Sequence, residues 1–136
     1  MGTRSDAIIP ITSAFQSWQN VTPFEFEKID DYSIPDVRLS FSGGAYFREN
    51  PRDVSYSSLQ TQGRIYFRDD IPWVIGAQPR KMDIETVALH EIGHILGLED
   101  SNVPSAVMYP TASWGVTKRN LDDDDISGIK ALYKFP

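Results

Sequence analysis

The chain has 136 residues, of which 40% are hydrophobic and 24% charged, and its net charge is −6 at neutral pH. This length and composition predict one soluble globular domain spanning residues 1–136, with a core large enough to fold alone. The negative charge argues against a nucleic-acid partner, no apolar run reaches the length of a membrane span, and the lack of cysteine excludes disulfides, thiolate metal sites and cysteine nucleophiles. Met1–Arg4 contains no apolar signal core, so any targeting segment or pro-segment is expected upstream.

The first predicted element is a helix entered through Pro10, because apolar residues follow it at three and four spacing. These residues are Ile11, Ala14, Phe15 and Trp18. Phe24 and Phe26 alternate with glutamates, which predicts a half-buried strand. The same alternation across Val37–Ser42 predicts a second strand, and Gly43-Gly44 should end it.

The middle of the chain is predicted to be mostly extended or irregular. Arg48–Gln62 is polar and poorly patterned, which indicates a loop with a short edge strand. Gly63–Arg68 places its apolar residues on one face and predicts another strand. Asp70–Lys81 contains two prolines and is predicted to be a long connection.

The clearest predicted helix covers Ile84–Leu96, with Asp83 as its N-cap and Gly97 just past its end. Asn102–Asn120 is predicted to be irregular, and a last helix is predicted from about Asp123 to Lys134. Its inward-facing residues should be Ile126, Ile129 and Tyr133. The order of helix, strands, helix, loop and helix predicts an α+β domain.

The chemistry of the chain lies in its only two histidines, within the sequence His90-Glu91-Ile92-Gly93-His94. Histidines four apart on a helix project from one face and can bind a single metal ion. Glu91 falls inside the apolar stripe of the same helix, where a carboxylate without a partner is costly. A chance match to this pattern in a chain of this length has a probability of roughly a few in a thousand. The sequence therefore predicts a zinc site.

A third protein ligand is needed, because catalytic zinc sites use three and leave one position for water. Gly97, three residues past His94, can adopt the left-handed conformation that ends the helix and turns the chain back. Asp100 then follows, and it is the predicted third ligand. Glu99 and the run Asp122–Asp125 are the alternatives, and an aspartate in a loop is ordinarily only solvated.

Several segments carry a resemblance to a known family. His90–Asp100 followed by Val107-Met108-Tyr109-Pro110 resembles the matrixin branch of the metzincin metalloproteases. Leu121–Tyr133 resembles the matrixin terminal helix, Phe15–Phe26 the family's first helix and second strand, and Ser113–Lys118 is most similar to plant matrixins. The resemblance covers nearly the whole chain. It implies a zincin-like fold, with a small twisted mixed sheet, an active-site helix, a Met-turn and a C-terminal helix.

For the catalytic site, the resemblance implies one role for each matching residue. His90 and His94 would be the first two zinc ligands, and Glu91 would take a proton from the attacking water and pass it to the leaving amine. Met108 would be the Met-turn residue, an apolar floor under the metal. Asp100 stands where the family has histidine, and its negative oxygen would make the zinc a weaker Lewis acid without abolishing the chemistry.

The resemblance also implies roles around this centre. Tyr109-Pro110 would form one wall of the primed-side specificity pocket, and Thr111–Asn120 its variable loop. Asp125 would be buried and hydrogen-bonded beneath the Met-turn, and Asp124 would be free to pair with a processed N-terminus. Asp122 and Asp123 are explained by favourable acidic charge at a helix N-terminus.

Other departures from the family pattern concern structural metals. Tyr66 occupies a position where the family has a histidine of its structural zinc site, and Arg68 and Ile71 stand where acids of a calcium site should be. The family's first strand is also missing. We therefore expect one catalytic zinc and neither the structural zinc nor the calcium sites.

The predicted function is a zinc-dependent endopeptidase that cuts extended polypeptide. The alternative is a degenerate matrixin that binds zinc or peptides with little turnover, and a third hypothesis is a metal-dependent hydrolase of a non-peptide substrate. The intact Glu91 favours the endopeptidase. By resemblance we expect a monomer that is secreted or at the cell surface and acts in the extracellular matrix. The sequon Asn20-Val21-Thr22 supports secretion only weakly, because Pro23 follows it.

Overall fold

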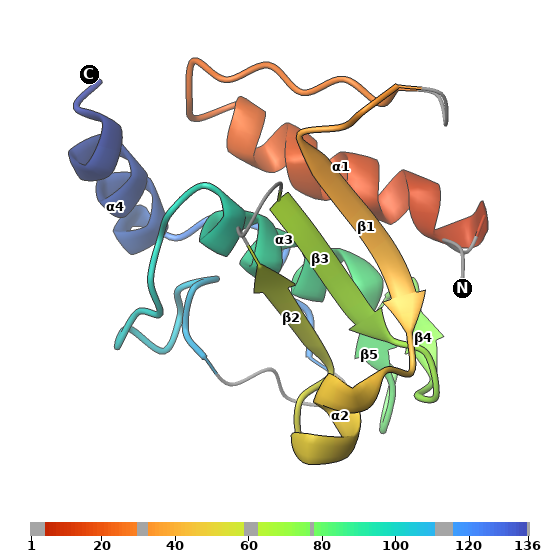
Figure 1. Ribbon diagram of the computed structural model, residues 1–136. Coiled ribbons are helices and arrows are strands. Elements are labelled where there is room, and N and C mark those ends of the chain that lie inside the picture. Colours follow the sequence, from red (N-terminus) through yellow and green to blue (C-terminus); the bar gives the residue numbers. More distant parts are fainter. Residues whose placement is uncertain (1–4, 30–32, 59–62, 77, 111–115, 136) are drawn as a thin grey trace.

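The computed structural model describes residues 5–29, 33–58, 63–76, 78–110 and 116–135. A 3-10 turn (Ser5–Ala7) leads into the first helix, and the chain then passes through a mixed sheet to two later helices (Figure 1). The helices are α1 (Ile8–Gln19), α2 (Ala45–Glu49), α3 (Ile84–Ile95) and α4 (Asp123–Tyr133). The strands are β1 (Val37–Ser42), β2 (Ser55–Ser58), β3 (Gly63–Arg68), β4 (Trp73–Val74) and β5 (Met82–Asp83). None of the described helices is long and apolar enough to cross a membrane.

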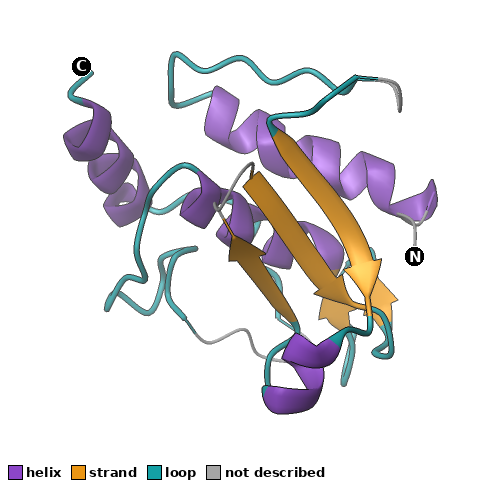
Figure 2. Ribbon diagram, in the orientation of Figure 1, coloured by secondary structure: helices purple, strands orange, loops and turns teal. Residues whose placement is uncertain are grey.

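The main sheet has three strands in the order β1, β3, β2. β1 runs parallel to the central β3, whereas β2 runs antiparallel to it and forms an edge. The short β4 and β5 make a separate parallel pair. Helices α1 and α3 lie together on one face of the sheet (Figure 1, Figure 2), and this arrangement confirms the predicted α+β fold.

The core lies between this sheet face and the two helices. Ile65 and Phe67 of β3 are fully buried, and the Phe67 ring stacks on Phe41 of β1 at a centroid distance of 5.1 Å. Trp18 of α1 is also fully buried, and its indole Nε1–H donates to the backbone oxygen of Leu89 in α3 at 2.9 Å. A buried Trp needs such a partner for its N–H, and here the bond ties α1 to the helix that carries both histidines.

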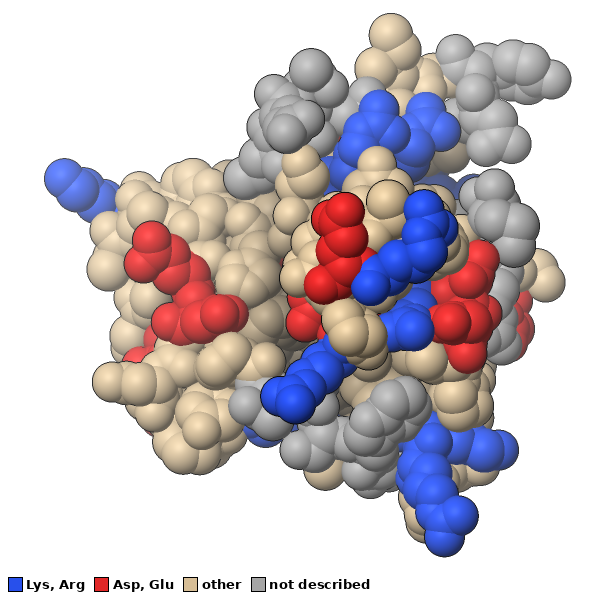
Figure 3. Space-filling model, turned by 60° about the horizontal axis from the view of Figure 1, so that its bottom comes forward, with Lys and Arg blue, Asp and Glu red and all other residues tan. Residues whose placement is uncertain are grey.

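The opposite face of the sheet carries a stack of three tyrosine rings. Tyr56 of β2 lies between Tyr46 of α2 and Tyr66 of β3, with centroid distances of 3.9 Å and 4.6 Å. The Tyr46 hydroxyl donates to Asp53 Oδ2 at 2.7 Å, and this bond, with burial and the charge of Asp53, raises the pKa of Tyr46 to about 12. Figure 3 shows acidic and basic side chains lying next to one another on the side of the molecule where α2 lies.

Most of the predicted elements are confirmed. β1 and β3 have the predicted bounds, β2 is the short edge strand expected within Arg48–Gln62, and α4 begins at the predicted residue. The Asp83 side chain caps α3 by accepting from the backbone N–H of Thr86 at 3.1 Å. Gly97 has a φ of +104° directly after the helix, as its turn-back role requires.

Several features differ from the predictions. Phe24 and Phe26 do not form a strand, because the Thr22 hydroxyl and the Gln19 side-chain oxygen accept their backbone N–H groups instead of a neighbouring strand. Tyr133 is 45% exposed rather than inward, with its ring edge against Phe24. The short helix α2 and the strand pair of β4 and β5 were not predicted. Helix α1 begins at Ile8, two residues before the predicted entry at Pro10.

Candidate metal centre and active site

Helix α3 positions both histidines at the surface while its other faces are buried. Val87, Leu89 and Ile92 are 3% exposed or less, whereas the side chains of His90 and His94 keep 21% and 26% of their surface exposed. Their rings lie edge to face with centroids 4.6 Å apart, as expected for residues four apart on one helix face.

Backbone carbonyl groups orient each imidazole. His90 Nδ1 lies 2.8 Å from the oxygen of Val107, and His94 Nδ1 lies 2.9 Å from the oxygen of Leu98. A carbonyl oxygen can only accept, so each Nδ1 is assigned the proton, and in the neutral imidazole Nε2 keeps its lone pair. This is the arrangement in which metal-binding histidines are usually held.

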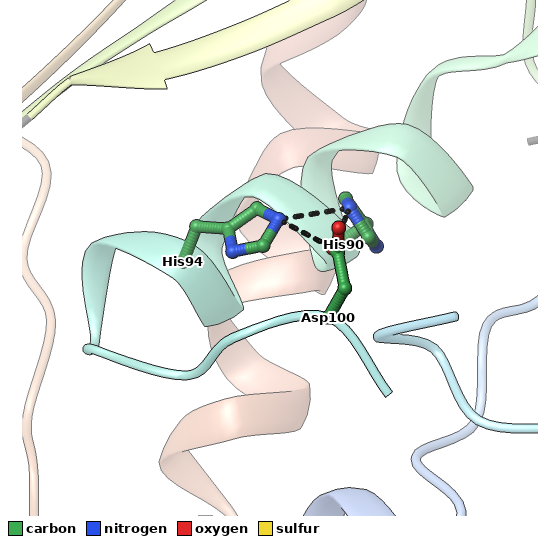
Figure 4. Close-up of side chains that lie close together, drawn as sticks. All are labelled: His90, His94 and Asp100. Atoms are coloured by element: carbon green, nitrogen blue, oxygen red, sulfur yellow. Dashed lines mark hydrogen bonds and ion pairs between the residues drawn. The ribbon is translucent and has the colours of Figure 1, made fainter. Parts of the chain in front are cut away.

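Asp100 completes a three-atom cluster with the two histidines (Figure 4). Its Oδ1 lies 3.1 Å from His94 Nε2 and 3.6 Å from His90 Nε2, and the two Nε2 atoms are 3.1 Å apart. Ligand atoms about 2.0–2.1 Å from one tetrahedral zinc are roughly 3.3 Å from each other. The three ligand atoms face one point at nearly these separations, so the donor set fits zinc.

The turn after α3 brings Asp100 to this position. The N–H of Gly97 donates to the oxygen of His94 at 3.0 Å, and the N–H of Leu98 donates to the oxygen of Gly93 at 2.9 Å. These bonds satisfy the helix end and reverse the chain. No other group of three metal-ligating side chains was found among the described residues, and the competing Glu99 is not part of this cluster.

Glu91 is buried in the apolar face of α3, with 4% of its surface exposed. The hydroxyl of Ser55, from the edge strand β2, donates to its Oε2 at 2.6 Å. The helical pattern predicted a buried carboxylate here that needs a partner. Sequence analysis missed Ser55. The only sequence feature that could have indicated it is its place at an inward-facing position of the edge strand.

Asp125 fixes the loop that contains Val107 and Met108. This carboxylate is 2% exposed and accepts from the backbone N–H groups of Val107 and Met108, at 2.9 Å and 3.1 Å. Met108 itself is 2% exposed. A Cβ added to Gly93 of α3 would lie 2.3 Å from its sulfur, so the helix touches the Met108 side chain directly.

The other acidic residues near this loop have different partners. Asp122 is the N-cap of α4 and shares a capping box with Asp125. Asp124 is exposed but not free, because the Ser101 hydroxyl donates to its Oδ2 at 2.6 Å. If Asp124 pairs with a processed N-terminus, the N-terminus therefore has to replace the Ser101 hydroxyl at this oxygen.

Sequence analysis missed Lys118, which contacts the loop before the predicted pocket wall and the ring of Tyr109. The Lys118 ammonium donates to the backbone oxygens of Pro104 and Ala106 at 2.6 Å and 2.9 Å, and lies 5.3 Å from the centroid of the half-buried Tyr109 ring. Pro110 is exposed. Positions 111–115 of the predicted variable loop lie outside the described residues.

The N-terminus of α3 is anchored by an ion pair between the buried Asp83 and the half-buried Arg119, which was also missed. Asp83 accepts from Arg119 Nε at 3.0 Å and Nη2 at 2.5 Å, as well as from Thr86 and the N–H of Gly76. Burial alone would raise the pKa of Asp83, but the hydrogen bonds from Arg119, Thr86 and Gly76 outweigh it and hold this pKa below its usual value. These bonds therefore hold the N-terminal end of α3 in place.

Comparison with known proteins agrees with this geometry. The family model described as matrixin matches residues 3–134. The chain is 35% identical over 129 residues to metalloendoproteinase 4-MMP of Arabidopsis thaliana. It is 34% identical over 134 residues to metalloendoproteinase 1 of Glycine max, and 34% identical over 142 residues to matrix metalloproteinase-16 of Homo sapiens.

These matches cover most of this chain but only part of each relative. They include 88%, 90% and 93% of this chain, and 38%, 44% and 23% of the three relatives in the same order. The chain therefore spans less than half the length of these proteins. Since the family model and these relatives both match over most of its length, the chain belongs to the matrixin family.

Proposed function

We propose that this domain is a zinc-dependent endopeptidase that hydrolyses peptide bonds in extended polypeptides. The observation that carries the proposal is the convergence of His90, His94 and Asp100 on one point. The buried Glu91 follows His90 directly in the same helix. Two imidazoles and one carboxylate are a known ligand set of hydrolytic zinc sites, with the fourth position left for water.

The proposed mechanism assigns proton transfer to Glu91. Bound zinc would supply Lewis acidity, which acidifies water and polarises the scissile carbonyl group. Glu91 takes a proton from the attacking water and passes it to the leaving amine. The negative oxygen of Asp100 would lower the effective charge at the metal and make the bound water less acidic, without abolishing the chemistry.

The edge strand β2 is the proposed substrate platform. It pairs only with β3 among the described residues, and its first residue, Ser55, contacts Glu91. An extended peptide can add to such an edge through backbone hydrogen bonds. It would then lie next to Glu91, with Tyr109 and Pro110 forming one wall of the pocket for a substrate side chain.

We further propose that this single zinc is the only metal of the domain. Tyr66, at a position of the family's structural zinc site, is instead stacked on Tyr56. Arg68, at a position of the family's calcium site, forms an ion pair with Asp70 at 2.5 Å. A monomeric, secreted or cell-surface protein acting in the extracellular matrix is the setting that the family relation supports.

Metal analysis combined with a peptide-cleavage assay tests this function. We expect about one zinc per chain, and cleavage that stops with chelator and returns with added zinc. Bound zinc without any cleavage would replace the endopeptidase with a binding module. Folded protein that was never exposed to chelator and holds no zinc would overturn the proposal altogether.

A further inference from the structure

Ser55 occupies a position that links the edge of the sheet to the active-site helix. It is paired with the buried Phe67 across β2 and β3, so its side chain points to the same face of the sheet as the core. From there its hydroxyl reaches Glu91 of α3, 36 positions along the chain. The O–H···O distance of 2.6 Å is in the range of hydrogen bonds to an ionised carboxylate.

The carboxylate of Glu91 depends on this contact more than an exposed one would. Glu91 is 4% exposed, so little water can replace a lost partner. Among the described residues, Ser55 is the one side chain or backbone group that donates a hydrogen bond to the Glu91 carboxylate. The bond engages only Oε2, which leaves Oε1 available for a proton.

We propose that Ser55 is a positioning residue for Glu91. Its hydroxyl fixes one oxygen of the carboxylate, and thereby sets the rotamer in which the other oxygen accepts the proton of the attacking water. Ser55 also belongs to β2, the proposed substrate platform. Its bond to Glu91 therefore fixes the position of the general base relative to the strand that would bind the peptide. This role rests on the proposed endopeptidase function.

The kinetic test compares two half-buried serines whose hydroxyls each donate a hydrogen bond. Ser17 of α1 donates to the backbone oxygen of Ser13 at 3.2 Å, and it lies outside the proposed substrate platform. We expect Ser55→Ala to lower kcat about tenfold or more with KM changed less than about twofold, as for an interaction that matters in the transition state. Ser17→Ala should stay near the wild-type kcat, and Ser55→Thr should restore most of the loss. A kcat loss in Ser17→Ala equal to that in Ser55→Ala would overturn the proposal.

A second measurement does not depend on activity. Urea unfolding of the chain as purified, for Ser55→Ala, Glu91→Gln and the double variant, gives the coupling between the two side chains. We expect the combined effect on the unfolding equilibrium constant to depart from the product of the single effects by about tenfold. Independent effects in an active enzyme would overturn the positioning role alone. A wild-type chain that cleaves no peptide would overturn the proposed function, and the positioning role with it.

Discussion

Gly93 of α3 packs directly against the Met108 side chain, and there is no space for a Cβ atom between them. A Cβ at Gly93 would lie 2.3 Å from Met108 Sδ, 3.0 Å from Trp18 Cζ2 and 3.1 Å from Met108 Cε. Alanine at this position therefore has to push the thioether away, bend the helix or both. Trp18 cannot give way easily, because it is fully buried and bonded to Leu89.

The size of the effect of Gly93→Ala follows from two opposing contributions. Replacing a helical glycine by alanine favours the helix by about 1 kcal/mol. Overpacking a close-packed core costs about 1–3 kcal/mol, and a contact at 2.3 Å with a residue that is 2% exposed belongs at the upper end. We therefore expect Gly93→Ala to lower the free energy of unfolding by about 2 kcal/mol. Zinc affinity should fall as well, because Val107, which orients His90, precedes the displaced Met108.

Gly128→Ala is the matched control, since Gly128 also lies inside a helix. A Cβ there would meet only Leu98 Cδ2, at 3.3 Å, and this half-buried side chain can move by a few tenths of an ångström. Its free energy of unfolding should change by less than about 1 kcal/mol. Urea unfolding and a chelator-competition titration measure both variants. The reasoning is refuted if Gly93→Ala is as stable as the wild-type chain.

Three more predictions concern the metal site, the helix anchor and the outer face. Asp100→Ala should weaken zinc binding at least about tenfold in a chelator competition, whereas Glu99→Ala should not, and equal affinities would remove Asp100 from the ligand set. Burial raises the pKa of Asp83, but its hydrogen bonds, including those from Arg119, outweigh it and hold this pKa below its usual value of 3.8. The ionised Asp83 therefore stabilises the fold above pH 3.8, and this contribution is lost as the pH falls below that value. The stability difference between wild type and Asp83→Asn in urea melts should therefore shrink toward about pH 3, and a constant difference would contradict this sign. Tyr56→Ala removes the middle ring of the tyrosine stack and should cost about 2–3 kcal/mol in urea unfolding with zinc content unchanged, so a loss of zinc would be the contrary result.

The parts of the site that follow from local spacing could be predicted from the sequence. The four-residue separation of His90 and His94 fixes their common face, and the apolar pattern of the same helix places Glu91 inside. Gly97 adopts a positive φ and returns the chain so that Asp100 meets the histidines. All of these depend on the geometry of one helix and its C-terminal turn.

The parts that depend on distant partners could not be predicted. Alternation at Phe24 and Phe26 predicts a strand only if another strand is available, and here the side chains of Gln19 and Thr22 accept those N–H groups. The contact between Ser55 and Glu91 joins two elements whose packing the sequence pattern does not specify.

The ion pair of Asp83 with Arg119 spans 36 positions. Periodicity has no signal for such a contact, because the arginine belongs to no regular element. The cap at Asp83 was nevertheless predictable, since an N-cap depends only on the helix that follows it.

The central claim, that Glu91 moves protons at a zinc site which it does not itself ligate, is tested most directly by Glu91→Ala. Zinc content and peptide cleavage are measured together for this variant and the wild-type chain. We predict that the variant keeps its zinc and its fold while cleavage falls by about a hundredfold or more. Cleavage close to the wild-type rate with zinc bound would contradict the mechanism, and loss of zinc from a folded variant would contradict the ligand assignment.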